Sequence, residues 1–294
     1  MTAKLISGLE IAARIRAEIK QEVELLKARY NVVPGLATVL VGSDPASVSY
    51  ITGKEKTAKE LGFYSERIDL PENTPQHNVA AVVNRLNHDA KVHGILVQVP
   101  LPKQINENEI LLLINPGKDV DGFHPVNIGK MVIGEPAYLP CTPAGIQQLL
   151  IRSGVETDGA EVVVVGRSNI VGKPIANILL QKSKGANATV TVCHTRTRDL
   201  AFHTRRADIL IVAAGKPKGI TADMVKTGAV VIDVGVNRVG IAKSGKAILV
   251  GDVDFESVKE VASMITPVPG GVGPMTITML MLNTLKAAKM ACGI

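Results

Sequence analysis

Hydrophobic residues recur along the chain at two different periods, and these periods predict alternating helices and strands. In residues 7–30, Ile11, Ile15, Ile19 and Val23 are spaced as they would be on one face of a helix. Elsewhere the apolar residues form short continuous runs, which are typical of strands buried on both faces. These runs occupy residues 35–42, 161–166, 208–215 and 229–235.

The first part of the chain reads as three βα units. We expect strands at residues 35–42, 63–70 and 92–100, and helices at residues 45–62 and 74–89. Strands separated by helices pair in parallel, so this part predicts a small parallel sheet.

Residues 115–145 are rich in Pro and Gly and have little periodicity, which predicts a loop-rich crossing between two domains. The alternation then resumes with strands at 161–166, 188–193, 208–215 and 229–235, and helices at 171–182 and 197–205. Strands this apolar predict a second α/β domain with a doubly wound, Rossmann-like sheet. A Pro/Gly loop that leads into an apolar helix follows within residues 266–290.

The composition is that of a soluble globular protein, with 46% hydrophobic and 20% charged residues among 294. No apolar run is long enough to cross a membrane, and the charges near the N-terminus argue against a signal peptide. The three cysteines, Cys141, Cys193 and Cys292, are odd in number and far apart. This favours a reducing compartment, so we expect a cytoplasmic protein. Because no apolar run could cross a membrane, we also expect no membrane partner.

The formal net charge of +6 is compatible with nucleic acid or with an anionic small substrate. The cations are spread along the chain, Trp is absent and aromatic residues make up only 3%, so we expect no nucleic-acid partner. The six histidines lack metal-ligand spacing, and Asp119 and Asp121 lack the further acidic ligands of an EF-hand. We therefore expect no metal, and we interpret His124 as a packed loop residue.

Residues 162–174 have the layout of a dinucleotide site. An apolar strand runs into Gly166, and Gly172 opens the following helix, so the backbone could approach a pyrophosphate. A Walker loop fits poorly, because Pro174 stands where Ser or Thr would bind magnesium. An ordinary strand–turn–helix corner remains the alternative.

The next strand predicts which nicotinamide cofactor is used. NAD sites place an acid at its end, whereas this chain has Thr195, Arg196 and Arg198 there, with Arg167 directly after the first glycine. A guanidinium can bind a ribose phosphate that a carboxylate would repel, so the pattern favours NADP. The alternative is that Arg196 and Arg198 are solvated surface residues.

Tyr50 and Lys54 lie one helical turn apart, either as a proton-transfer pair or as part of a solvated helix face. Gly53 lies between them, and Gly in a helix costs about 1 kcal/mol relative to Ala, which suggests that a flat ligand packs closely. Short-chain dehydrogenases share the YxxxK spacing, but their glycine loop precedes the pair, whereas here it follows. Gln98 ends a buried strand, where ligands bind in parallel sheets.

Six segments together resemble the bifunctional methylenetetrahydrofolate dehydrogenase/methenyltetrahydrofolate cyclohydrolase family. They are SVSYITGKEK (47–56), GILVQVPLP (94–102), KDVDGFHP (118–125), PCTPAG (140–145), GRSNIVGKP (166–174) and TPVPGGVGPMT (266–276). Together they span essentially the whole chain in order. Thr195 is a small departure, since the family commonly has Ser at that position.

The resemblance implies two α/β domains around a cleft and a homodimer. Residues 1–138 with the last helix, 277–294, would form the folate-binding catalytic domain, and residues 139–276 the Rossmann-like NADP-binding domain. It also implies NADP-dependent oxidation of 5,10-methylenetetrahydrofolate and hydrolysis of the methenyl product to 10-formyltetrahydrofolate, within one-carbon metabolism and purine biosynthesis.

The resemblance further implies a role for each matching residue. Lys54 would be the catalytic acid/base, Tyr50 would lie against the folate, Gln98 would tune Lys54, and Asp121 would hydrogen-bond the pterin. The implied cofactor contacts are Gly166, Arg167, Ser168, Thr195, Val236, Gly273 and Thr276.

Two other functions remain open from the sequence. One is a dehydrogenase, using NAD or NADP, whose cyclohydrolase step is weak. The other is a non-catalytic regulator that only binds the nucleotide. The set of Tyr50, Lys54, Gln98 and Asp121 argues against the regulator, because a nucleotide sensor has no use for these side chains.

Overall fold

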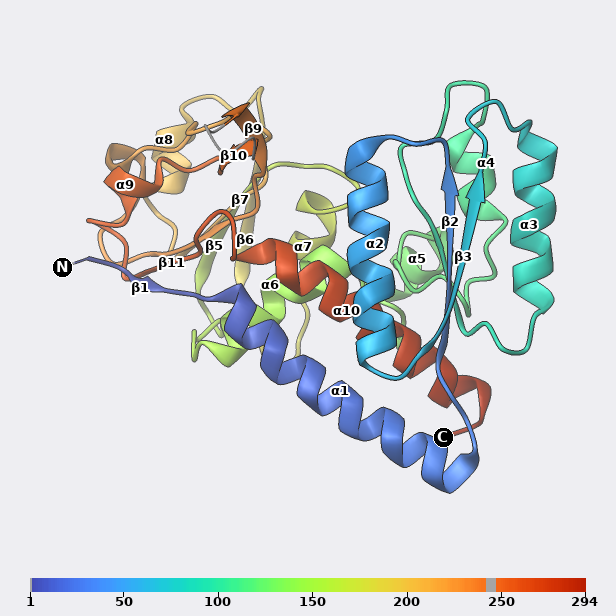
Figure 1. Ribbon diagram of the computed structural model, residues 1–294. Coiled ribbons are helices and arrows are strands. Elements are labelled where there is room, and N and C mark those ends of the chain that lie inside the picture. The colour runs from blue at the N-terminus through green and yellow to red at the C-terminus, as the bar shows by residue number, and fades with distance from the viewer. Residues whose placement is uncertain (1, 242–246) are drawn as a thin grey trace. The chain divides into compact units, whose positions relative to one another are not determined.

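The computed structural model describes residues 2–241 and 247–294. Its contacts divide the chain into two compact units, drawn in Figure 1. The first unit consists of residues 14–141 and 277–294, and the second of residues 2–13 and 142–276. Both units are built from parallel sheets and helices, so the prediction of two α/β domains is confirmed.

The first unit is built on a parallel sheet in the order β3-β2-β4. Its strands are β2 (Gly35–Val41), β3 (Tyr64–Leu70) and β4 (Gly94–Val97). Its helices are α1 (Gly8–Tyr30, from residue 14 on), α2 (Pro45–Glu60), α3 (Gln76–His88), α4 (Glu107–Leu112), α5 (Pro125–Ile133) and α10 (Val272–Ala291, from residue 277 on).

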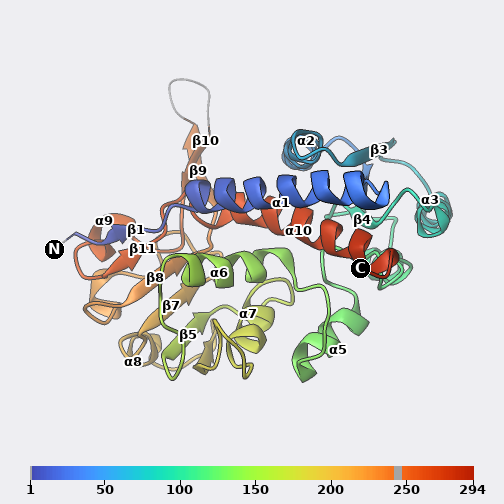
Figure 2. The ribbon, with the colours of Figure 1, turned by 90° about the horizontal axis from the view of Figure 1, so that it is seen from below.

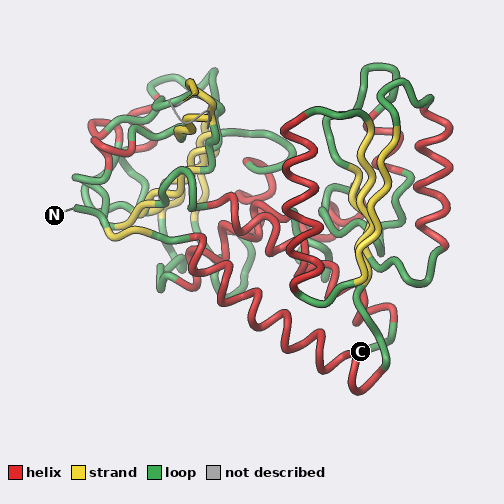
Figure 3. Tube along the Cα trace, in the orientation of Figure 1, coloured by secondary structure: helices red, strands yellow, loops and turns green. Residues whose placement is uncertain are grey.

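The core of the first unit explains why β2 and β4 are uniformly apolar. Every residue of both strands is buried. On one face, Val79, Val83 and Leu86 of α3 pack against the two strands, while α2 lies on the other side of the sheet (Figures 1 and 3). Helices therefore cover both faces of the sheet, as its apolar runs predicted.

Helices α1 and α10 lie side by side in the first unit (Figures 1 and 2). The Arg16 guanidinium donates to Thr278 Oγ1 at 2.9 Å, and Lys289 forms an ion pair with Glu22. These polar contacts join α1, from residue 14 on, to the last helix within one unit.

The second unit contains a six-stranded parallel sheet in the order β1-β11-β8-β7-β5-β6. Its strands are β1 (Lys4–Leu5), β5 (Glu161–Val165), β6 (Thr189–Cys193), β7 (Ile209–Val212), β8 (Val230–Asp233) and β11 (Met264–Ile265). Its helices are α6 (Cys141–Arg152, from residue 142 on), α7 (Gly172–Leu179), α8 (Leu200–Thr204), α9 (Phe255–Val258) and a short 3-10 helix, η1 (Ala222–Met224).

An antiparallel pair, β9 (Asn237–Ile241) and β10 (Ala247–Val250), projects from the rest of the second unit (Figure 2). Val239 and Ile241 of this pair are more than half exposed. The apolar alternation did not predict these strands, because they are solvated rather than buried.

Two sequence expectations differ from the structure. Residues 115–145 were expected to be loop, but α5 forms within them, capped by the His124 side chain and ended by Gly134 at φ 79°. The resemblance assigns residues 1–138 to the folate-binding domain, yet residues 2–13 belong to the second unit, where β1 pairs with β11. A strand of two residues is too short to be recognised from its pattern.

Candidate active site and cofactor site

Helix α2 presents Tyr50 and Lys54 in the first unit. Its start is fixed by Asp44, whose carboxylate accepts a hydrogen bond from Ser47 N at 2.8 Å, and by Pro45 in the first turn. Lys54 is only 8% exposed, while Tyr50 is 51% exposed, and the Lys54 Nζ lies 6.0 Å from the Tyr50 ring centre. Lys54 is therefore not a solvated surface charge.

Gln98 is the partner of the Lys54 amine. It follows β4, and its backbone N–H still pairs with Val39 O at 2.9 Å. Lys54 Nζ donates to Gln98 Oε1 at 3.0 Å, and Gln98 Nε2 donates to Val99 O at 2.7 Å. The second bond fixes the orientation of the amide, so its oxygen faces Lys54.

Asp121 approaches the same end of the sheet. Ile95 N donates to Lys118 O at 2.8 Å, and Asp119 forms a parallel bridge with Ile95, so the following residues run toward the carboxyl end of β4. Burial lowers the pKa of Lys54, and the charge of Asp121 opposes that shift. Burial also raises the pKa of Asp121, opposed by Lys54. Burial thus favours the neutral form of each group, and the charge of each favours the ionised form of the other.

Cys141 belongs to this group, although the sequence interpretation used it only as evidence of a reducing compartment. It is 1% exposed, and its single thiol proton has two acceptors within reach, the Asp121 carboxylate and Val120 O, which lies 3.4 Å from Sγ. Burial raises the pKa of this thiol well above its ordinary value, so it stays protonated as a donor. The only sequence signal was its place in the segment 140–145.

Asp119 and His124 serve the backbone instead. Asp119 is buried and accepts hydrogen bonds from Phe123 N, His124 N and Asn127 Nδ2.

Within the described residues, no group of three or more His, Cys, Asp or Glu side chains could hold a metal ion. Likewise, no described helix is long and apolar enough to span a membrane.

In the second unit, two glycines shape the turn between β5 and α7. Gly166 has φ 137°, and a Cβ there would lie 2.2 Å from Ala213 O. A Cβ on Gly172 would lie 2.2 Å from the carbonyl oxygen of Gly166. Only glycine fits at either position, and the result is a bare backbone turn at the carboxyl end of β5.

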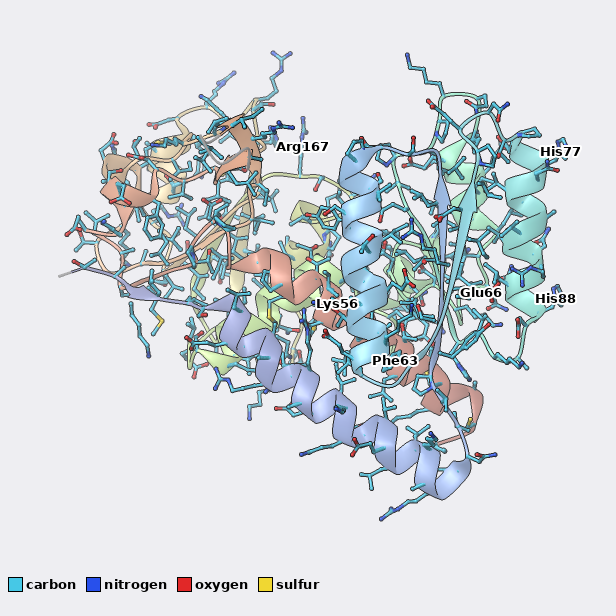
Figure 4. The ribbon with its side chains drawn as sticks, viewed as in Figure 1. Lys56, Phe63, Glu66, His77, His88 and Arg167 are labelled. Carbon is cyan, nitrogen blue, oxygen red and sulfur yellow. The ribbon has the colours of Figure 1, made fainter. Side chains whose placement is uncertain are left out.

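A cavity of about 520 Å³ opens beside this turn. Its lining includes Gly166, Arg167, Ser168 and Thr195 from the predicted cofactor set (Arg167 is labelled in Figure 4). Its walls are apolar, from Val165, Leu200, Val212 and Ile220, and its polar groups also include His194, Thr197, Lys216 and Asp252. A cavity of this size with apolar walls, hydroxyls and cations suits a phosphorylated nucleoside.

The remaining predicted cofactor residues do not line this cavity. Val236 is 54% exposed after β8, and Gly273 lies in the first turn of α10. Thr276 pairs through its hydroxyl with Thr142 Oγ1 at 2.9 Å. Arg196 and Arg198 are also absent from the lining. The sequence did not single out His194, Lys216 or Asp252, which do line it.

Two buried aspartates hold the loops around the cavity. Asp252 is 0% exposed, and its carboxylate accepts from Ala214 N at 2.7 Å, Gly215 N at 2.8 Å and Asn237 Nδ2 at 2.8 Å. Asp233 is 3% exposed and accepts from three backbone N–H groups, including that of Asp252 at 2.9 Å. Burial raises the pKa of Asp233 to about 6 despite these bonds.

A cavity of about 680 Å³ also lies in the first unit, but it holds none of the predicted site residues. Its lining includes Lys91, His93 and Lys118, near the amino ends of β2 and β4. Ligands of parallel sheets bind at the carboxyl ends, where Lys54 and Gln98 meet, so we place the active site there.

Comparison with known proteins gives a consistent result over both units. The family model for the tetrahydrofolate dehydrogenase/cyclohydrolase catalytic domain matches residues 6–121, and that for the NAD(P)-binding domain matches residues 140–292. The chain is 68% identical to the "Bifunctional protein FolD" of Syntrophus aciditrophicus, over 100% of both chains. It is 63% identical to the protein of the same name from Syntrophobacter fumaroxidans, over 98% of both chains.

Solved structures agree in fold. The bifunctional FolD enzyme of Campylobacter jejuni is 48% identical, with a TM-score of 0.91 over 98% of this chain and 99% of that one. The FolD of Trypanosoma brucei, solved with NADP cofactor and an inhibitor, is 40% identical, with a TM-score of 0.94 over 100% of both chains.

The raised pKa of Asp233 predicts a specific pH dependence of stability. Its folded value of about 6 lies above the ordinary 3.8, so its contribution to stability is fully present below about pH 4 and is lost as the pH rises through 6. We expect the unfolding free energy of the wild type, minus that of Asp233→Asn, to fall by about 3 kcal/mol over this range. Urea unfolding at a series of pH values measures the difference, and a flat profile would contradict the assignment.

Proposed function

The chain belongs to the tetrahydrofolate dehydrogenase/cyclohydrolase family, and from this premise we propose that it catalyses two consecutive reactions. With NADP it oxidises 5,10-methylenetetrahydrofolate to the 5,10-methenyl form, and it then hydrolyses this product to 10-formyltetrahydrofolate. The observation on which the second reaction rests is a buried lysine, Lys54, hydrogen-bonded to the neutral amide of Gln98.

The oxidation requires orientation more than proton transfer. When bound, NADP would supply the acceptor for the hydride that the one-carbon bridge of the folate loses. The task of the chain is to hold both reactants in register. Arg167, Ser168 and Thr195 offer a guanidinium and two hydroxyls beside the bare turn at Gly166, which suits the phosphates of NADP.

The hydrolysis requires a base and then an acid. Water adds to the methenyl carbon, and neutral Lys54 takes a proton from it. The resulting ammonium donates that proton to N5 as the bond between this carbon and N5 breaks. The remaining hydroxyl proton leaves for solvent as the formyl carbonyl forms. A pKa lowered by burial favours the neutral amine that the first of these steps requires.

The other side chains of the first unit would orient the folate. Asp121, with its raised pKa, can exchange hydrogen bonds with the pterin edge, and the exposed Tyr50 ring can pack against the flat ligand. Gln98 holds Lys54 without a negative charge, so it does not raise the lysine pKa as a carboxylate would.

The two alternative functions have less support. A pure nucleotide-binding regulator would not need a buried lysine with an oriented amide partner. A dehydrogenase with weak hydrolysis would not need them either, because hydride transfer makes no use of Lys54 as a base. Relatives at 63–68% identity are named as bifunctional, which supports the main proposal.

We also propose a cytoplasmic homodimer. The three cysteines are free, with Cys141 and Cys193 buried and Cys292 exposed, as suits a reducing compartment. Strand β6 ends the six-stranded sheet and pairs only with β5 among the described strands. It has no charged residue, and its Val192 is 41% exposed. An uncharged edge strand is suited to pairing with a second copy.

Replacing Lys54 tests the hydrolytic role. Lys54→Met should reduce cyclohydrolase activity about 100-fold or more, because general acid–base catalysis is lost, while NADP reduction persists and methenyl product accumulates. Absorbance of the two products separates the steps. Lys56→Met is the matched control, since the Lys56 side chain is 77% exposed on the same helix (Figure 4). Hydrolysis at the wild-type rate in Lys54→Met would contradict the proposal.

Replacing Arg167 tests the cofactor assignment. Arg167→Gln should raise the KM for NADP about tenfold to 100-fold, the worth of one charge-assisted hydrogen bond. The KM for NAD should change little, because NAD lacks the ribose phosphate. Arg198→Gln, outside the cavity lining, is the control and should leave both values near those of the wild type. Equal effects of Arg167→Gln on NAD and NADP would exclude a phosphate contact.

A charge placed on β6 tests the homodimer. Val192→Lys should convert a dimer to a monomer in sedimentation experiments, because a lysine on an edge strand disfavours its pairing with a strand of a second copy. Val132→Lys, at a position 45% exposed on α5, is the control and should not change the mass. A wild type that sediments as a monomer would exclude the proposal, and a Val192→Lys protein that remains dimeric would exclude this interface.

A further inference from the structure

Asn283 is a nearly buried amide on the apolar helix α10, with 9% of its surface exposed. Its Nδ2 donates to Val120 O at 2.8 Å and to Leu139 O at 3.0 Å, and it lies 3.8 Å from Cys141 Sγ. A side-chain amide has two N–H donors, which here match two backbone carbonyls, one buried and one half-buried.

Both carbonyls adjoin groups of the candidate active site. Val120 directly precedes Asp121, and Leu139 lies two residues before Cys141. The two segments are also in tight contact, since a Cβ on Gly122 would lie 2.7 Å from Leu139 C. Asn283 therefore joins the backbone beside the carboxylate to the backbone beside the thiol.

Other bonds hold the same segments farther from Asp121. Lys286, also on α10, donates from Nζ to Ala137 O at 2.8 Å, and the Tyr138 hydroxyl donates to Gly117 O at 2.9 Å. These bonds keep Ala137 attached to α10 and Tyr138 attached to Gly117 when Asn283 is changed. The effect of changing Asn283 should therefore be a local shift at Asp121 and Cys141 rather than loss of the fold.

We propose that Asn283 is a positioning residue, whose amide places Asp121 and Cys141 against the folate and Lys54. The proposal rests on the proposed function, because the roles of Asp121 and Lys54 are part of it. Asn283 does not touch the reacting atoms. It acts through the two carbonyls, so its loss changes folate binding and hydrolysis and leaves NADP binding unaffected.

The test compares Asn283→Ala and Asn283→Ser with a matched control, Thr284→Val. Thr284 is fully buried on the same helix, but its hydroxyl donates to Leu280 O of that helix, at 2.8 Å, and not to the segments beside Asp121. Asn283→Ser keeps one donor and is expected to fold if Asn283→Ala does not. Unfolding free energies of all three variants show that comparisons are made at similar stability.

We expect Asn283→Ser to raise the KM for methylenetetrahydrofolate and the Kd for tetrahydrofolate about tenfold, and Asn283→Ala to raise them more. The KM for NADP should stay within about twofold of the wild type in both. Thr284→Val should leave all three constants near wild-type values. A merely structural role would instead give Asn283→Ser and Thr284→Val the same constants at equal stability, and this result would overturn the proposal.

The Kd measurement separates the positioning role from the proposed function. A wild type that binds tetrahydrofolate without turning over the methylene form would contradict the function, yet a tenfold weaker Kd in Asn283→Ser would still support positioning. A wild type that binds no tetrahydrofolate would overturn both.

Discussion

The hydrogen bond between Lys54 and Gln98 is the interaction on which the active site depends. Removing an ammonium group from water is costly, and a chain usually offsets this with a carboxylate partner. Here the direct partner, at 3.0 Å, is a neutral amide. The atom that holds the amine therefore carries no net charge, and the nearby charge of Asp121 only partly offsets the effect of burial on the lysine pKa. The cap of α2 and the end of β4 both serve to bring these two side chains together.

The second unit likewise buries ionisable groups that have neutral hydrogen-bond partners, but there the groups are carboxylates. Asp233 and Asp252 are buried carboxylates whose described hydrogen-bond partners are backbone N–H groups and one amide. They join the loops that follow β7 and β8, where the cofactor cavity opens. Each unit thus contains ionisable groups in a low-dielectric setting, with neutral dipoles as partners. Such groups fix loop geometry, and their pKa values respond strongly to burial.

Much of this could be predicted from the sequence, because the central strands are buried on both faces and their apolar runs are unmistakable. The pairing of Lys54 with Gln98 was foreseen from the family resemblance and not from spacing, since the two residues are 44 positions apart. The turn at Gly166 was predicted because only glycine permits its close backbone contacts. Arg167, Ser168 and Thr195 lie with it in the lining of one cavity, and their contacts with the cofactor stay predictions.

Other features could not be read from the pattern, for identifiable reasons. Helix α5 was missed because its flanking Pro and Gly residues obscure a short amphipathic segment. Cys141 and Asn283 act through contacts with distant segments, and no local period reports such contacts. Asn283 stands in the apolar run of α10 beside Thr284, and nothing in that local pattern shows which distant carbonyls its amide reaches. Val236, Gly273 and Thr276 stay predictions, since they lie outside the cavity that the other cofactor residues line.

The most direct measurement is an assay of the wild-type protein with 5,10-methylenetetrahydrofolate and either NADP or NAD, in which reduced cofactor and methenyl product are followed together. We expect rapid formation of reduced NADP with little free methenyl product, and slower turnover with NAD. Methenyl product that accumulates and then decays at the uncatalysed rate would contradict the assignment of Lys54, and absence of turnover with either cofactor would contradict the function as a whole.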